Sequence, residues 1–220
     1  MRSCVILIVG TLAFGGVAHA QSAATTAQAD HGYVEIVAQS AFGNVTSQSY
    51  GAEVGFTVLP HLQVFVEGGQ TRDVATPELS TAAQTIAGGL FSLTQPLVVG
   101  YSVKEPVTFF AAGARYLPAM VGARTQPYVM GGFGSAKVKQ NVVFTVGGTD
   151  VTSTLQQYGV VLGTDLSGAF TSPLLILGGG VTHPLWTRVT LDFQFRFGRI
   201  FAEETPINVT RAGLGVGIRF

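Results

Sequence analysis

Two segments near the C-terminal end alternate apolar and polar side chains. In segment 189–197 every odd-numbered position is large and apolar, and Thr, Asp, Gln and Arg stand between them. In segment 212–220 the even-numbered positions are apolar, with glycine or arginine between them. Successive side chains of a β-strand point to opposite faces, so this period of two predicts two strands, each with one apolar and one polar face.

The same alternation recurs along the chain and predicts eight strands. They are expected at 33–42, 50–59, 62–72, 107–117, 126–139, 172–181, 189–197 and 209–220. A continuation of the fifth strand through 142–146 is left open, because the turn signal Gly147-Gly148-Thr149-Asp150 follows it. Most links are short, but 73–106 and 139–171 are long.

Helices are predicted inside both long links. Thr76-Pro77-Glu78 has the order of a helix start, with a hydroxyl cap, a proline at the first position and an acid in the first turn. Apolar residues at helical spacing follow in each link. They are Leu79, Ala83, Ile86 and Leu90 in the first, and Leu155, Tyr158 and Leu162 in the second.

The composition is typical of a chain that faces lipid rather than of a soluble domain. Of the 220 residues, 47% are hydrophobic and only 11% are charged, whereas charged residues make up about 25% of ordinary soluble domains. No apolar run long enough to cross a membrane as a helix is found, and 29 glycines disfavour a helical fold. The 12 basic and 12 acidic residues balance, which gives no support for a nucleic-acid partner.

The N-terminal segment 1–20 has the order of a secretory signal peptide. Arg2 provides the positive start, an apolar stretch follows, and Ala18-His19-Ala20 is a small-x-small cleavage site. Segment 21–32 is then a polar periplasmic lead-in, and 33–220 is the folded domain. The one cysteine, Cys4, lies in the signal segment, so the mature chain is expected to form no disulfide.

The polar faces of the strands carry few charges, and those charges nearly balance. Such a face is too poor in polar groups to hydrate the outside of a soluble barrel, where the apolar face would fill the interior. Buried charge is tolerated when it is paired, so we expect lipid at the perimeter and a charge network in the interior. Its expected members are Glu35, Glu53, Glu67, Asp192, Arg115, Arg188, Arg196, Arg211 and Arg219. A contact between Glu35 and Arg219 is predicted; the alternative is that some of these residues are rim charges in water.

The strand pattern, the alternation of short and long links and the ending on Phe220 together resemble the small eight-stranded outer-membrane β-barrel family, typified by the transmembrane domain of OmpA and by OmpX and opacity-like proteins. The resemblance implies an all-β, antiparallel, up-and-down transmembrane barrel in the cell outer membrane, surrounded by lipid and lipopolysaccharide. It also implies that the barrel-assembly machinery reads the C-terminal strand, with Phe220 as the signal. Because nothing follows Phe220, no peptidoglycan-anchoring domain like that of OmpA is expected.

Aromatic residues are expected to form belts at the two membrane interfaces. The predicted periplasmic belt consists of Tyr33, Tyr116, Tyr128, Trp186 and Phe220, and the opposite rim carries Phe42, Tyr50 and Phe197. Outer-membrane barrels have short periplasmic turns and longer outer loops, which places the two long links outside the cell.

No catalytic, cofactor or metal site is predicted. His31, His61 and His183 fall in the lead-in and in periplasmic turns, away from the outer rim where lipid chemistry would need a base. The glycine clusters at 131–134 and 178–180 do not open helices, so they are not phosphate loops. Asp150 and Asp165 lack a calcium-loop pattern.

Two functional hypotheses remain. The first is a non-enzymatic barrel with a structural role or a role in surface contact through its outer loops, whose ligand the sequence does not reveal. The alternative is a narrow, porin-like channel or a lipid-modifying enzyme. Eight strands leave an interior that side chains about fill, and the glycines at 213, 215 and 217 raise the question of whether a path remains past the charges.

Overall fold

A computed structural model describes residues 31–119, 124–161, 163, 166–203 and 205–220. The expected signal peptide and nearly all of the lead-in lie outside the described residues, as do Leu162 and Asp165.

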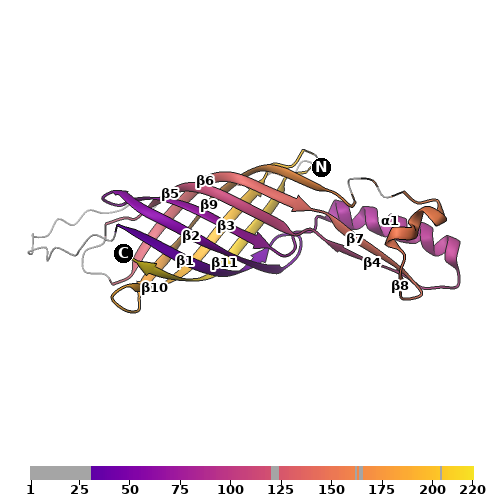
Figure 1. Cartoon of the computed structure of the whole chain (residues 1–220), viewed down its shortest axis with the longest axis horizontal. Coiled ribbons are helices and arrows are strands. Elements are labelled where there is room, and N and C mark those ends of the chain that lie inside the picture. Colours follow the sequence, from indigo (N-terminus) through magenta and orange to yellow (C-terminus); the bar gives the residue numbers. More distant parts are fainter. Residues whose placement is uncertain (1–30, 120–123, 162, 164–165, 204) are drawn as a thin grey trace, which may run out of the picture.

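Eight strands close into one antiparallel barrel. They are β1 (Gly32–Phe42), β2 (Ser47–Leu59), β3 (Leu62–Thr71), β5 (Val107–Tyr116), β6 (Gln126–Lys139), β9 (Ala169–Pro184), β10 (Val189–Ile200) and β11 (Ile207–Arg219). Each strand pairs with the next barrel strand in the chain, and β11 pairs with β1 to close the wall (Figure 1). The eight predicted strands and the up-and-down topology are therefore confirmed.

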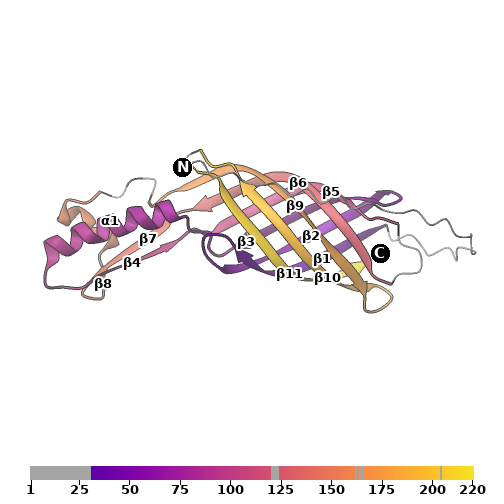
Figure 2. The same ribbon diagram turned by 180° about the vertical axis from the view of Figure 1, so that it is seen from behind.

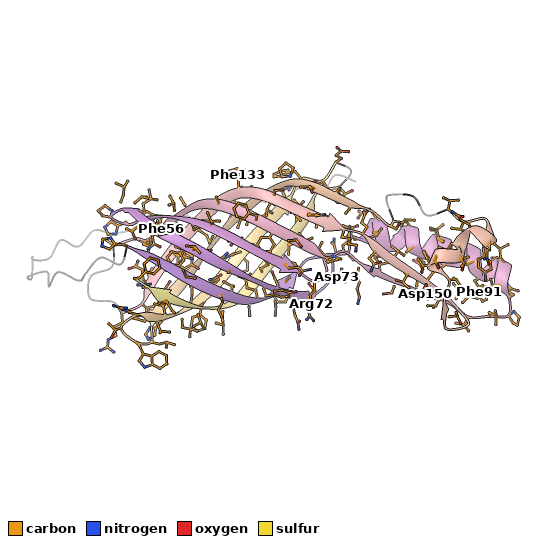
Figure 3. All side chains as sticks on the ribbon, in the orientation of Figure 1. Phe56, Arg72, Asp73, Phe91, Phe133 and Asp150 are labelled. Atoms are coloured by element: carbon orange, nitrogen blue, oxygen red, sulfur yellow. The ribbon has the colours of Figure 1, made fainter. Side chains whose placement is uncertain are left out.

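The apolar face of this wall points outward. Ile36 and Phe193 are 67% and 53% exposed, whereas Asp192 and Arg196 are 0% and 2% exposed. Figure 3 shows Phe56 and Phe133 projecting from the outside of the barrel. The predicted assignment of faces is confirmed: apolar side chains form the perimeter and the charges lie inside.

The aromatic prediction is only partly right. Tyr116, Trp186 and Phe220 are exposed near the end of the barrel where the chain ends, as a belt requires. Tyr33 and Tyr128, however, are buried inside the barrel, 5% and 3% exposed. Both have the strand parity of inward-facing residues, and their hydroxyl groups bond to interior carboxylates, which holds the rings away from lipid.

The two long links fold together into a lobe beyond the barrel. The lobe contains α1 (Pro77–Thr94), the 3-10 helix η1 (Thr152–Tyr158) and a three-stranded sheet of β4 (Val99–Lys104), β7 (Asn141–Val146) and β8 (Thr149–Asp150). It lies at the end of the barrel opposite Phe220, as both views show (Figures 1 and 2). One face of α1 packs on this sheet through Leu79, Ala83, Ala87 and Leu90, against Val142, Phe144 and Val146.

The start of α1 is as predicted. Thr76 is the N-cap, and its Oγ1 accepts a hydrogen bond of 3.3 Å from the backbone N–H of Leu79. The second predicted helix is the 3-10 helix η1. Strand β4 was not predicted, and the continuation of the fifth strand forms β7, outside the barrel.

Strands β4 and β7 extend the β5–β6 pair past the barrel rim. Val107 is opposite Val138 in the barrel, and Lys104 is opposite Asn141 in the lobe, so the register is unchanged across the break. The backbone N–H of Lys139 donates to the carbonyl of Pro106 at this junction. The lobe is therefore carried on a ribbon that is continuous with the barrel wall.

Among the described residues, no helix is both long and apolar enough to cross a membrane.

Candidate functional site

The interior charges of the barrel form one connected network centred on Glu53. Its two carboxylate oxygens contact Arg115 Nη2 at 2.6 Å and Arg196 Nη2 at 2.7 Å. Arg196 also pairs with Glu67, which in turn contacts Arg211 Nη2 at 3.1 Å. The five side chains come from β2, β3, β5, β10 and β11, so the network joins opposite walls of the barrel.

Two tyrosines complete the network around Arg115. Its guanidinium lies 3.9 Å from the centroid of the Tyr128 ring and 4.7 Å from that of Tyr33. Tyr33 donates its hydroxyl hydrogen to Glu53, and Tyr128 donates to Asp192 Oδ2 at 2.8 Å. Cation–π contacts with desolvated guanidinium groups contribute about 2 kcal/mol each. Sequence reasoning missed both residues as interior groups, although their parity, shared with Glu35 and Met130, indicates the inward face.

Glutamine side chains link the remaining acids. Gln194 Nε2 donates to Glu35 and, at 3.1 Å, to Asp192 Oδ2, while Gln39 donates to Gln194 Oε1 at 3.3 Å. Asp192 also lies 3.7 Å from Arg115 Nη2. Glu35 is thus tied to the network through an amide.

The structure brings together seven of the nine predicted charges. The interior holds the carboxylates of Glu35, Glu53, Glu67 and Asp192 and the guanidiniums of Arg115, Arg196 and Arg211, a formal charge of 3 − 4 = −1. Arg188 is exposed and lies outside this interior set, in keeping with the rim alternative, and Arg219 is partly exposed at the end of β11. The register places Arg219 opposite Tyr33 and Glu35 opposite Gly217, so the Glu35–Arg219 contact stays a prediction.

Large side chains fill the space left by the interior glycines. A Cβ atom at Gly215 would collide with the Glu35 carboxylate, whereas one at Gly213 would first meet the backbone of Ala38 and Gln39 on the neighbouring strand. The Tyr33 ring occupies the place of a side chain at Gly55 in the same way. Gly55 and Gly215 therefore give room to Tyr33 and Glu35, two members of the network.

An apolar layer covers the network on the side of the lobe. It consists of inward-facing residues at the lobe end of the strands, together with Val74 from the link between β3 and α1. Its members are Ala41, Val74, Val107, Phe109, Ala111, Ala136, Val138, Leu174, Ile176, Ile200, Ile207 and Val209. Arg211 lies 4.3 Å from the centroid of the Phe109 ring, where the two layers meet. The cavity at this boundary has a volume of only about 20 Å³, roughly the space of one water molecule.

Two acids fix the junction between barrel and lobe. Asp73 Oδ1 accepts hydrogen bonds of 2.9 Å from the backbone N–H groups of Ala75 and Glu105. Glu105 Oε2 accepts one of 2.8 Å from the backbone N–H of Thr76 at the start of α1. Burial raises the pKa of the Glu105 carboxyl above its ordinary value, and the hydrogen bonds from the Thr76 backbone N–H and the Gln140 side chain oppose the shift.

The three described histidines, His31, His61 and His183, lie at the end of the barrel that carries Phe220. Two of them lie in or beside the turns at the end of the barrel that carries the chain terminus: His61 in the β2–β3 turn, with a φ of 73°, and His183 near the end of β9, within 3.0 Å of Thr125 Oγ1. His31 donates its backbone N–H to the carbonyl of Phe220. In the part of the chain that the structure describes, no three His, Cys, Asp or Glu side chains are grouped to hold a metal ion.

The geometry defines the class of protein. A closed barrel with an apolar perimeter and a charged, filled interior is stable with lipid around it, because water cannot solvate the outside and the ring of strands leaves no unpaired edge. The chain is therefore an integral membrane β-barrel protein.

Comparison with solved structures gives the particular fold. Neisserial surface protein A aligns with a TM-score of 0.52 at 15% identity, over 86% of this chain and 96% of that one. A major outer-membrane protein from Thermus thermophilus aligns with a TM-score of 0.52 at 13% identity, over 86% and 99% of the two chains. No protein-family model matches the sequence, and no curated protein matches it. The fold is that of the small eight-stranded outer-membrane β-barrels, which agrees with a location in the outer membrane.

Proposed function

We propose that this chain is a non-enzymatic, non-conducting integral outer-membrane protein that acts in envelope integrity or in surface contact through its outer loops 73–106 and 139–171. The observation that carries the proposal is the division of the molecule into a doubly sealed barrel and an ordered lobe. A charge network and an apolar layer fill the barrel, so the role of the barrel is to anchor the lobe in the membrane. The lobe has its own core and an exposed surface, so it supplies the contact.

The lobe has the surface of a contact module. Its far end, residues 91–98, exposes the side chains of Phe91, Leu93, Leu97 and Val98. A contiguous exposed apolar patch on a soluble surface is typical of an interaction site, and these four residues fall within eight positions of the chain. Figure 3 shows Phe91 at the end of the lobe away from the barrel.

The same proposal includes the partners of the barrel itself. Outer-membrane lipid and lipopolysaccharide surround the apolar perimeter, and the barrel-assembly machinery binds the C-terminal strand that ends in Phe220. The parity of the links supports an orientation with the lobe outside the cell and the turns around His61 and Trp186 in the periplasm. Nucleic acid is not a partner of this nearly neutral chain.

Limited proteolysis of whole cells tests the orientation. Chymotrypsin added to intact cells is expected to cut after Phe91, which is 46% exposed at the end of α1, and to spare Trp186, which is 70% exposed in the turn before β10. Opening the outer membrane should make Trp186 cleavable too. Cleavage at Trp186 in intact cells with Phe91 spared would reverse the orientation.

Conductance measurements test the seal. In planar bilayers the wild-type barrel and a Glu53→Gln variant should both remain closed, because the apolar layer does not depend on Glu53. Stepwise conductance of the wild type that changes in the variant would establish the channel alternative. Mass spectrometry of lipid A from expressing cells tests the enzyme alternative, and a change in its acyl chains would contradict the proposal.

A further inference from the structure

A cavity of about 610 Å³ lies between the lobe and the barrel rim. Its walls are the start of α1, residues 166 and 168–172, and residues 202, 203, 205 and 207, and Glu105 and Gln140 line it as well. The apolar layer of the barrel contributes Ile207 to it, and Phe170 packs against that layer from the cavity side. Its volume falls in the range of about 300 to 1,000 Å³ typical of small-molecule sites.

The cavity is negatively polarised. Three acidic residues line it: Glu78 and Glu203 are exposed, and Glu105 is buried and accepts a hydrogen bond from the Thr76 backbone N–H. None of the described residues that line it is Lys, Arg or His. The bases nearest along the chain, Lys104, Lys139 and Arg199, do not line it; Arg199 instead lies 5.7 Å from the centroid of the Phe201 ring. A wall of carboxylates without a base favours a cation by charge complementarity.

The cavity also has an apolar wall. Leu79, Leu166 and Ile207 are each no more than 6% exposed, and the half-buried ring of Phe170 stands beside them. A fully hydrated inorganic ion would gain nothing from this wall. A molecule that carries both an apolar body and a positive charge would use the two halves of the cavity together.

We propose that this cavity binds a small organic cation, a protonated amine carried on an apolar body, with the amine toward Glu78 and Glu203 and the body against Phe170, Leu79 and Ile207. The site goes beyond the proposed role of the lobe in surface contact and depends on it only for access from outside the cell. It is distinct from the exposed far end of the lobe, because it lies at the lobe's base.

Binding measurements on the barrel in phosphatidylcholine nanodiscs test the site. The probe is 4-phenylbutylammonium, compared with the neutral 4-phenylbutanamide and the anionic 4-phenylbutanoate, each titrated by calorimetry against protein-bearing and protein-free discs. The cation should bind saturably and at least about tenfold more tightly than the amide. Raising the salt concentration should weaken the binding of the cation and leave that of the amide unchanged.

Single substitutions locate the binding. Glu78→Gln and Glu203→Gln change exposed side chains, so the fold is retained, and each should weaken the cation by roughly three- to tenfold. Asp150→Asn is the matched control, since Asp150 is an exposed acid on the same lobe but outside the cavity (Figure 3), and it should have no effect. Ala202→Trp should narrow the cavity and weaken the binding of both cation and amide.

Three results would overturn the site: no saturable signal above protein-free discs, equal affinity for cation and amide, or a loss with Asp150→Asn as large as that with Glu78→Gln. The proteolysis and conductance tests of the proposed function are read from different experiments. If the binding measurements fail while the proteolysis and conductance results are as expected, the ligand site is refuted and the proposed function stands.

Discussion

Glu53 holds the two halves of the interior network together, so its neutralisation is the most informative perturbation of the barrel. Glu53→Gln keeps the shape of the side chain but removes the charge that faces Arg115 and Arg196 at 2.6 and 2.7 Å. The Glu53 side chain is 0% exposed and those of the arginines at most 4%, so water cannot replace the lost charge. Removing one partner of a buried ion pair costs about 3 to 5 kcal/mol. We expect the free energy of unfolding to fall by that amount.

Urea unfolding in lipid vesicles measures this loss. The fluorescence of Trp186, the one tryptophan of the chain, reports the transition from its exposed position in the turn before β10. Asp150→Asn serves as the control and should change the free energy of unfolding by less than about 0.5 kcal/mol. If Glu53→Gln unfolds within about 1 kcal/mol of the wild type, the network does not stabilise the barrel in the way described.

Three further predictions concern single contacts. Tyr33→Phe removes the hydroxyl donor to Glu53 and should cost about 1 to 3 kcal/mol in the same assay, whereas Tyr116→Phe, on the exposed belt, should be neutral. Gly55→Ala places a methyl group into the Tyr33 ring and should reduce the yield of refolded barrel, read as heat-modifiable mobility on a gel; Gly68→Ala, whose nearest neighbour would be 3.7 Å away, should not. Burial raises the pKa of Glu105, so the folded lobe favours the protonated acid, and the resistance of the lobe to chymotrypsin should decline as the pH rises above the ordinary pKa of a glutamate. Glu105→Gln should flatten this decline. A variant with the same pH profile as the wild type would refute the prediction.

The barrel could be predicted from the sequence because a period of two is a local signal. The alternation with adjacent residues shows on which face of the strand Phe193 and Arg196 lie. The near balance of charges then indicates which face is inside. Tyr33 and Tyr128 are the exceptions, because the common position of tyrosine at membrane interfaces predicts a belt, whereas their parity places them inside. The hydroxyl partners that decide the matter, Glu53 and Asp192, lie on other strands.

The lobe could be predicted only in part for a different reason. Thr76 and Pro77 mark a helix start by local chemistry alone, and α1 begins there. Strand β4 is six residues long, and its partner β7 lies some forty residues away, so no short-range signal identifies the pair. The cavity at the base of the lobe is still less local, since its three walls meet only in the folded chain.

The register continues unbroken from β5 and β6 into β4 and β7, so the length of this two-stranded ribbon sets the distance between the lobe and the barrel. Each residue added to both strands of the ribbon would lift the lobe by about 3.3 Å. An insertion of two residues in each strand would raise the lobe by about 7 Å in its present orientation, whereas one residue in each would turn its covered face to the opposite side. The distance of the lobe from the barrel can therefore change with its orientation preserved only by insertions of an even number of residues in each strand.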